Sequence, residues 1–296
     1  MVNRVVFAVA QIGKHSGKSI LECFSFFEGG SGIFYQSFCR RIWKMEKLMY
    51  VAVICLYILF GIGSLNAQER ESFLPGKEYY GIACLKAPDT HYNLYLPSSY
   101  DPARKWPLLF IYSPGGNARF DQYKETAEHI GWILVGSVEC RNGPMEPIIK
   151  HQDALLEEVM ARFSVHPHRL YASGGSGGAR MAFRMLYVHG FDGIIPVAGG
   201  EWGGLRRPVP WAIIYGISGT KDFNNEEMRQ LSLVLPETYV KEFVFEVFEG
   251  PHGPAPTELV SKAMVYLDNQ FQYKTDRHLE EDKVRFLKVT EEKKKD

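Results

Sequence analysis

The sequence Gly-Gly-Ser-Gly-Gly at residues 174–178 fits the G-x-S-x-G pattern of a nucleophile elbow, a sharp turn between a strand and a helix. Residues 169–173, before the turn, favour a β-strand, and residues 177–189, after it, combine helix formers with an apolar stripe. Glycines suit the turn because it is strained and neighbouring backbone passes close to it. The stretch therefore predicts a strand–turn–helix unit with Ser176 at its apex as a nucleophile.

Two further residues follow predicted strands in the order that a catalytic triad needs. The apolar run 211–217 predicts a buried strand, and Asp222 comes shortly after it. The alternating run 242–248 predicts another strand, and His252 lies in the Gly/Pro loop that follows. A serine needs a base to take its proton and an acid to orient that base. The order serine, acid, histidine is that of α/β-hydrolases, so Asp222 is predicted as the acid and His252 as the base.

Each partner has an alternative reading when taken alone. An aspartate after a strand is often a turn former or helix cap, and a histidine in a Gly/Pro loop is often only solvated. The other acids to weigh are Asp192, Glu201 and Glu249, none of which follows the penultimate strand.

Acyl transfer also needs hydrogen-bond donors for the oxyanion that develops. One is expected to be the N–H of Gly177, directly after the nucleophile. The other is expected from the loop that follows a predicted strand at 107–112, which runs Ser-Pro-Gly-Gly-Asn over residues 113–117. Because Pro114 has no N–H, Gly115 is the better candidate there, with Gly116 behind it. A plain Pro-Gly turn is the alternative.

Four segments together resemble secreted esterases of the polyhydroxybutyrate depolymerase and feruloyl or acetylxylan esterase type: 107–117, 167–178, 219–222 and 250–253. The resemblance covers residues 78–270. It implies an α/β-hydrolase fold, hydrolysis of carboxylic esters through an acyl-enzyme, and the triad Ser176, Asp222 and His252. The chain departs from this family at Ser113-Pro114, where relatives usually carry His-Gly, which leaves the second oxyanion donor open.

The order of predicted elements favours a mostly parallel sheet with helices on both faces. One domain, residues 68–272, holds all of them. Strands are expected at 78–86, 91–96, 107–112, 132–138, 169–173, 193–197, 211–217 and 242–248, and helices at 119–130, 148–163, 177–189, 225–234 and 256–270.

The short connection at residues 199–210 predicts a minimal lid and an open cleft, which suits an ester carried on a carbohydrate or polymer. Within it, Trp202 is a candidate for stacking on a sugar or aryl ring, beside Glu201, Arg206 and Arg207 as a possible substrate rim. The alternative is that these side chains pack locally or are solvated.

The composition limits the classes of binding partner that the sequence favours. Lys plus Arg equals Asp plus Glu, at 34 each among 296 residues, so no global field favours nucleic acid. The sequence shows neither a phosphate-binding glycine motif nor histidines and cysteines at metal-ligand spacing, and no cofactor is expected. The expected partner is a small-molecule or polysaccharide ester. Oligomeric state is left open.

The N-terminal region suggests export. The apolar run 50–63 is short for a membrane span and suits a signal-peptide core, with a cleavage site after Ala67. We expect residues 1–44 to be an over-extended start, 45–67 a signal peptide, and 273–296 a charged tail. The protein would then be secreted or periplasmic, with no membrane attachment after cleavage. The competing hypothesis is a signal anchor with basic residues on the cytoplasmic side.

Two cysteines, Cys84 and Cys140, fall in the predicted mature part, and a disulfide and two buried thiols are both consistent with that. The leading functional hypothesis is a serine esterase. The alternatives are a serine peptidase with the same triad, and a non-catalytic carbohydrate-binding or scaffold protein that kept the elbow.

Overall fold

The computed structural model describes residues 72–236 and 238–272. Contacts divide the chain between Glu71 and Ser72, and all described residues belong to the second unit. The segments expected to be an over-extended start (1–44), a signal peptide (45–67) and a charged tail (273–296) lie outside the described residues and stay predictions.

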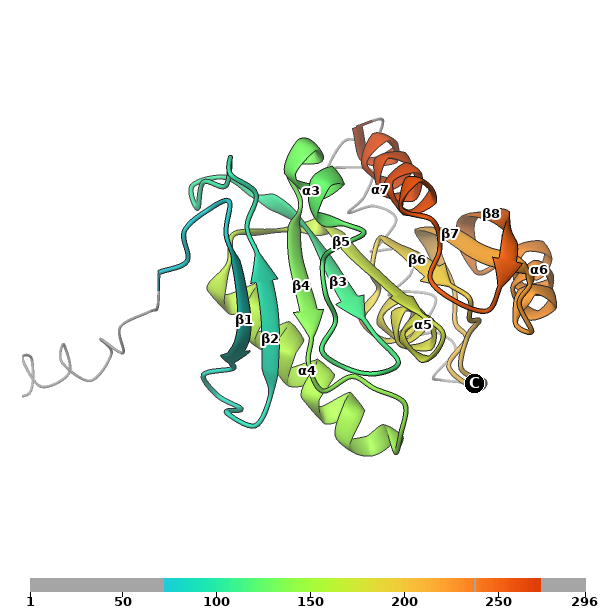
Figure 1. Ribbon diagram of the computed structural model, residues 1–296, viewed down its shortest axis with the longest axis horizontal. Coiled ribbons are helices and arrows are strands. Elements are labelled where there is room, and N and C mark those ends of the chain that lie inside the picture. Colours follow the sequence, from blue (N-terminus) through green and yellow to red (C-terminus); the bar gives the residue numbers. More distant parts are fainter. Residues whose placement is uncertain (1–71, 237, 273–296) are drawn as a thin grey trace, which may run out of the picture. The chain divides into compact units, whose positions relative to one another are not determined.

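Within the described residues, eight strands form one mixed sheet in the order β1-β2-β4-β3-β5-β6-β7-β8 (Figure 1). The first two strands pair antiparallel to their neighbours, and the sheet is parallel from β4 through β8. The carboxyl ends of the parallel strands therefore meet at one edge, where ligands bind in sheets of this kind. The strands are β1 Glu78–Ala83, β2 His91–Tyr95, β3 Trp106–Tyr112, β4 Ile133–Ser137, β5 Val165–Gly175, β6 Gly193–Val197, β7 Val209–Lys221 and β8 Val240–Pro251.

Helices cover both faces of the sheet (Figure 1). On one face α4, α5 and α6 pack their apolar sides against a core that contains Phe110, Leu155 and Met181. On the other face α3 and α7 enclose a second core around Leu109 and Met264. Burial on both sides explains why the central strands are continuously apolar. The helices are α3 Lys124–Ile130, α4 Met145–Arg162, α5 Gly177–His189, α6 Asn225–Val234 and α7 Thr257–Gln272.

The predicted α/β architecture is confirmed, with differences at the ends of elements. The helix expected at 119–130 begins only at Lys124, because the preceding segment is tied to the sheet: Ala118 N–H bonds to Ser137 O, and the Asn93 amide donates to Ala118 O. The elbow strand, expected at 169–173, begins at Val165, which pairs with Trp106.

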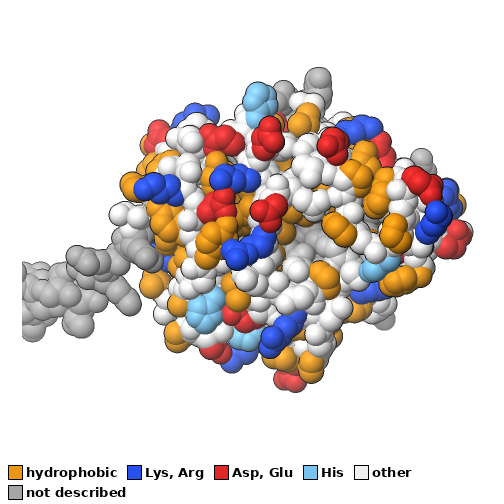
Figure 2. Space-filling model, viewed as in Figure 1, with side chains coloured by type: hydrophobic (Ala, Val, Ile, Leu, Met, Phe, Trp, Pro, Cys, Tyr) orange, Lys and Arg blue, Asp and Glu red, His pale blue; other side chains and the backbone are white. Residues whose placement is uncertain are grey.

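Charged side chains of both signs are interspersed on the face of the molecule shown in Figure 2. This distribution accords with the equal numbers of acidic and basic residues. In the part of the chain that the structure describes, no helix is both long and apolar enough to cross a bilayer.

Candidate active site

Ser176 lies on a strained turn between β5 and α5. Its backbone has φ 50° and ψ −112°, in the region that side chains other than glycine avoid. Its N–H donates to Val197 O at 2.8 Å. A Cβ on Gly174 or on Gly178 would come within 2.6 or 2.4 Å of the carbonyl oxygen of Tyr112. The tight packing of α5 on the sheet thus holds the serine in a conformation that presents its side chain at the sheet edge.

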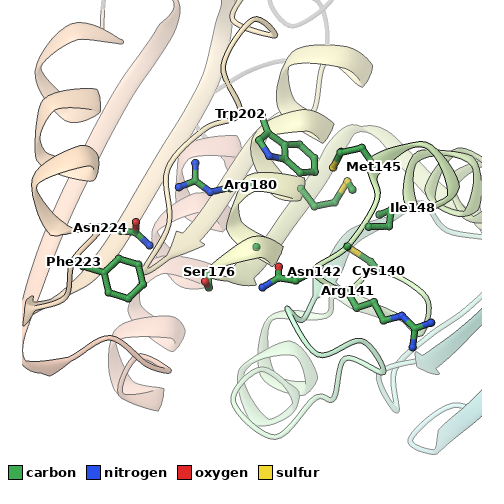
Figure 3. A pocket seen from close by; sticks show the side chains of 13 residues that line it. Cys140, Arg141, Asn142, Met145, Ile148, Ser176, Arg180, Trp202, Phe223 and Asn224 are labelled. Carbon is green, nitrogen blue, oxygen red and sulfur yellow. The ribbon is translucent and has the colours of Figure 1, made fainter.

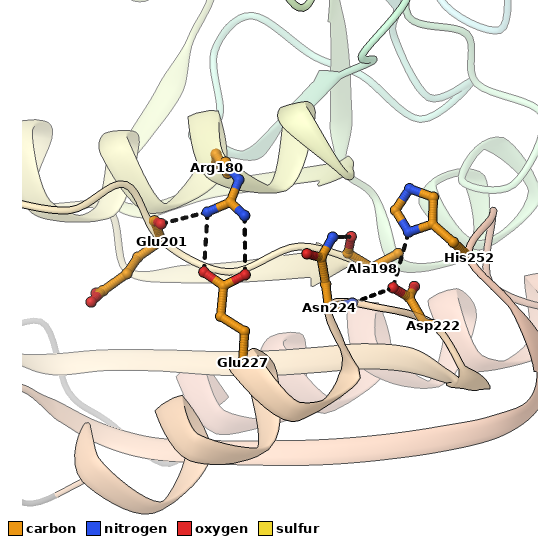
Figure 4. A network of polar contacts seen from close by, with 7 residues as sticks. All are labelled: Arg180, Ala198, Glu201, Asp222, Asn224, Glu227 and His252. Atoms are coloured by element: carbon orange, nitrogen blue, oxygen red, sulfur yellow. Dashed lines mark hydrogen bonds and ion pairs between the residues drawn. The ribbon is translucent and has the colours of Figure 1, made fainter.

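Asp222 and His252 directly follow the neighbouring parallel strands β7 and β8, whose ends pair at Lys221 and Pro251. The shared edge brings the two side chains together, and His252 Nδ1 lies 3.0 Å from Asp222 Oδ1 (Figure 4). The Asp222 side chain is fully buried, whereas that of His252 is 28% exposed. A carboxylate bound at Nδ1 fixes the tautomer in which Nε2, on the far side of the ring, is free to accept a proton.

Asn224 holds the acid loop in place. Its backbone N–H donates to Asp222 Oδ1 at 2.7 Å, and its side-chain amide donates to Ala198 O at 2.8 Å (Figure 4). Ala198 follows β6 and has a positive φ of 52°. Asn224 therefore links the loop after β7 to the loop after β6, which fixes the position of the carboxylate.

Phe223 lies against the outer side of the imidazole. Its ring stacks on that of His252 with centroids 4.2 Å apart and an interplanar angle of 28°. The ring is nevertheless 75% exposed, which is unusual for a large apolar side chain. The Phe223 ring therefore covers one face of the imidazole.

Two pockets in the described part of the chain meet at Ser176. The first, which we call the Tyr123 pocket, has a volume of about 380 Å³ and contains both Ser176 and His252. The Tyr123 hydroxyl bonds to Ser173 Oγ at 3.0 Å, so the ring is left to line the pocket. Most of its other walls are apolar: Ile111, Tyr112, Ala118, Val197 and Pro254.

The second, which we call the Trp202 pocket, has a volume of about 300 Å³ and contains Ser176 and Gly177 (Figure 3). Its walls mix polar, aromatic and aliphatic side chains, among them Asn142, Met145, Ile148, Arg180, Trp202 and Phe223. Trp202 thus lies in a pocket that reaches the serine, as the stacking prediction requires. Whether it binds substrate stays a prediction.

Two of the other predicted rim residues, Glu201 and Arg206, bond to each other, whereas the Nε of Arg207 is buried without a hydrogen-bond partner among the described residues. Glu201 accepts hydrogen bonds from Arg206 and from the Tyr187 hydroxyl, the latter at 2.8 Å. Arg180 makes a bidentate pair with Glu227 and also donates to Glu201 O (Figure 4). These bonds brace the connection between β6 and β7.

The alternative acids are also engaged away from the imidazole. Asp192 accepts the N–H of Leu170, and Glu249 bonds to Thr220 and Lys221. Of the four acids weighed from the sequence, the structure therefore brings Asp222 to His252.

The two expected oxyanion donors are placed differently. Gly177 begins α5, so its N–H has no acceptor within the helix, and the residue lines the Trp202 pocket beside Ser176. Gly115 is exposed, lines neither pocket, and directs its N–H to Ser113 Oγ at 3.3 Å. Its role as a donor stays a prediction, and the structure gives it a local partner instead.

The thiols of Cys84 and Cys140 are free and buried, which answers the question that the sequence left open. Burial raises the pKa of each from its ordinary value of 9.0 to about 12. Both are therefore protonated at neutral pH and poor nucleophiles.

Asn142, Phe223 and Asn224 are absent from the sequence-based site. Asn224 follows Asp222 by two residues, a spacing at which an aspartate accepts a backbone N–H, so local turn chemistry was a usable signal. Phe223 and Asn142 reach the site through tertiary packing, and no local pattern marks them.

Comparison with solved structures identifies the fold. The chain is similar to FphF, a fluorophosphonate-binding serine hydrolase of Staphylococcus aureus, with 12% identity over 66% of this chain and 99% of that one and a TM-score of 0.50. It is equally similar to the S-formylglutathione hydrolase FrmB of the same organism, with 12% identity, coverage of 67% and 100%, and a TM-score of 0.51. These similarities show that the protein has the α/β-hydrolase fold. No protein-family model and no curated protein sequence matches the chain.

Proposed function

We propose that the protein is a serine hydrolase that cleaves carboxylic esters through an acyl-enzyme. The observation that carries the proposal is the 3.0 Å contact between His252 and the buried Asp222, in a pocket that also contains Ser176 on its strained turn. Both structures compared above are named as hydrolases, and the resemblance of the sequence to secreted esterases points the same way.

In this mechanism Ser176 Oγ attacks the ester carbonyl while His252 Nε2 takes its proton. The imidazolium so formed is stabilised by Asp222 and gives the proton to the departing alcohol. Water then attacks the acyl-enzyme, again with His252 as base, and releases the acid and free Ser176. The described residues of the site perform every step, and the proposal requires no cofactor.

The two pockets suggest how an ester lies across Ser176. The Tyr123 pocket is largely apolar and of a size for a short aliphatic or an aromatic acyl group. The Trp202 pocket offers an aromatic face and polar groups, which suit the alcohol part, a sugar among the candidates. We propose acetyl, feruloyl or similar esters on carbohydrate or polymer as substrates, in line with the polyhydroxybutyrate depolymerase and feruloyl or acetylxylan esterase resemblance.

A panel of esters tests the proposal. The wild type is expected to hydrolyse p-nitrophenyl acetate, and Ser176→Ala is expected to leave only the weak rate that binding and the oxyanion site supply. Acyl lengths from acetate to palmitate, beside acetylated xylan, methyl ferulate and a hydroxybutyrate oligomer, locate the specificity. Unchanged activity in Ser176→Ala contradicts the triad, and a maximum at palmitate contradicts the assignment of a short or aromatic acyl group.

Trp202→Ala tests the assignment of the second pocket. The carbohydrate ester should lose more than the small chromogenic ester, because binding energy from remote parts of a substrate can be used in the transition state. Equal losses on both substrates remove Trp202 from the substrate site.

A non-catalytic carbohydrate-binding protein is the second candidate. It is favoured by the engagement of the Gly115 N–H with Ser113, which leaves the loop after β3 without its expected oxyanion donor. Folded wild-type protein that binds acetylated xylan yet hydrolyses none of the esters supports this candidate.

We also propose that the protein is exported, on the strength of the signal-peptide pattern at residues 45–67. Mass spectrometry of protein from the envelope or medium of an expressing Gram-negative host should show a chain that starts at Gln68. A chain that keeps the apolar run 50–63 and stays in the inner membrane supports the signal anchor.

A further inference from the structure

The loop after β4 brings Asn142 to the nucleophile. Its backbone N–H donates to Pro114 O at 2.8 Å, and the adjacent Arg141 forms a backbone bridge with Gly115. The loop after β4 is thereby tied to the loop after β3, at the sheet edge where Ser176 stands. This antiparallel bridge, of which the bond between Asn142 and Pro114 is part, fixes the position from which the Asn142 side chain extends.

The Asn142 side chain occupies the space beside Gly177. A Cβ on Gly177 would lie 1.8 Å from Asn142 Oδ1 and 2.9 Å from its Cγ, far inside contact distance. Gly177 has no positive φ, so its backbone does not require glycine. A side chain at position 177 would therefore displace the Asn142 amide from its present position.

The orientation of the amide suits a donor. Figure 3 shows the amide nitrogen of Asn142 turned toward Ser176, on the side of the Trp202 pocket. The amide carries two N–H donors. Oδ1 is the amide atom nearest the Cβ position of Gly177, at 1.8 Å, and Nδ2 lies 3.5 Å from that position, so the nitrogen is turned away from it. Asn142 is exposed in the free protein, so these donors are open to a substrate.

The loop after β3 does not supply the second oxyanion donor from its expected residues. Pro114 has no N–H, and the Gly115 N–H is directed to Ser113 Oγ. Acyl transfer by the proposed mechanism needs more than the single donor of Gly177 to reach the usual stabilisation of the oxyanion.

We propose that Asn142 is a catalytic residue whose side-chain N–H donates to the oxyanion beside the N–H of Gly177. When Ser176 Oγ bonds to the ester carbon and its proton passes to His252, the carbonyl electron pair moves to the oxygen that these two groups bind. On collapse the carbonyl re-forms, the bond to the alcohol breaks, and the alcohol leaves with the proton from His252. This assignment rests on the proposed esterase function.

The first test removes the donor and keeps the volume. Asn142→Leu is expected to lower kcat for p-nitrophenyl acetate by about 100- to 1000-fold, as loss of one oxyanion donor does, with KM changed less than about threefold. Because Asn142 is exposed, the variant should keep the wild-type circular dichroism and melting temperature. Asn142→Ala, measured in parallel, shows whether leucine itself obstructs the pocket.

The second test uses the contact with Gly177. Gly177→Ala should displace the amide and lower kcat about as far as Asn142→Ala does, while in the Asn142→Ala background it should cause no further loss. Gly203→Ala is the matched control, because a Cβ there meets nothing within 4 Å. A purely structural role for Asn142 predicts instead a lowered melting temperature with kcat retained.

Four outcomes overturn the proposal. Full kcat in both Asn142 variants shows that the amide is no donor, and a comparable loss confined to Ser113→Ala transfers the role to that hydroxyl. If the losses in kcat caused by Gly177→Ala and Asn142→Ala multiply in the double variant, the two positions act separately. A wild type that hydrolyses no ester overturns the esterase function as well, so the two failures are told apart by the wild-type rate.

Discussion

Replacing Asp222 with asparagine separates two contributions of the carboxylate, the tautomer of the imidazole and the negative charge. Asp222 Oδ1 faces both His252 Nδ1, at 3.0 Å, and the N–H of Asn224, at 2.7 Å, while Oδ2 is buried with no hydrogen-bond partner among the described residues. An asparagine with its oxygen in the Oδ1 position keeps both bonds. If the amide were flipped, its NH₂ group would face His252 Nδ1 and the N–H of Asn224, which are both donors. We therefore expect the variant to keep the tautomer and lose only the charge.

The two substitutions at this position should then differ widely. A hydrogen bond to a charged group contributes about 1–2 kcal/mol more than a neutral one, so kcat/KM of Asp222→Asn should fall about 5- to 30-fold. Asp222→Ala loses both bonds, and removal of the acid alone from a serine-protease triad costs on the order of 10,000-fold in kcat. The assay is kcat/KM for p-nitrophenyl acetate from about pH 5 to 9.

The reasoning is refuted if Asp222→Asn loses as much activity as Asp222→Ala. That result would mean that the amide flips or that the imidazole changes tautomer. Because the variant buries an NH₂ group without an acceptor, its unfolding free energy in urea should drop by about 1–3 kcal/mol, and the kinetics are therefore measured well below the unfolding transition.

Three further predictions concern the surroundings of the site. Phe223→Leu removes the ring that stacks on His252 with centroids 4.2 Å apart, and since such a pair contributes about 0.5–1.5 kcal/mol to holding the imidazole, kcat/KM for p-nitrophenyl acetate should fall about two- to tenfold; an unchanged kcat/KM contradicts an orienting role for Phe223. Native protein treated with iodoacetamide at pH 8 should stay unlabelled at Cys84 and Cys140, as measured by peptide mapping. Because the pKa of both thiols is raised in the folded protein, the stability that the neutral thiols contribute is complete below pH 9 and is lost as the pH rises toward 12. Gly178→Ala places a Cβ 2.4 Å from a β3 carbonyl, so the unfolding free energy should fall by about 1–3 kcal/mol, and a wild-type melting temperature would contradict the packing of the elbow.

The order of strands and helices could be predicted from the sequence because strands such as β3 and β6 are continuous apolar runs and helices such as α6 have one apolar side. The same regularity located the candidate site, since Ser176, Asp222 and His252 each directly follow a strand and parallel strands end at one edge. Local pattern was sufficient for these three positions because the geometry of the sheet supplies the long-range contacts.

Other parts of the site depend on contacts that no local pattern encodes. Asn142 reaches Gly177 only because the loops after β3 and β4 are joined by backbone bonds, and Phe223 becomes relevant only once His252 lies against it. The orientation of the Gly115 N–H depends on the Ser113 rotamer. Likewise, cysteine spacing carries no distance, so the free state of the thiols required the structure.

The central claim is that Ser176 is an activated nucleophile, and labelling with a fluorophosphonate probe at neutral pH measures this most directly. The probe reacts with a hydroxyl whose proton is taken by a base, and an ordinary serine does not react. We expect stoichiometric labelling of folded wild-type protein, located to Ser176 by peptide mass spectrometry, greatly reduced in His252→Ala and absent in Ser176→Ala. Folded wild-type protein that stays unlabelled, or a label on another residue, contradicts the account.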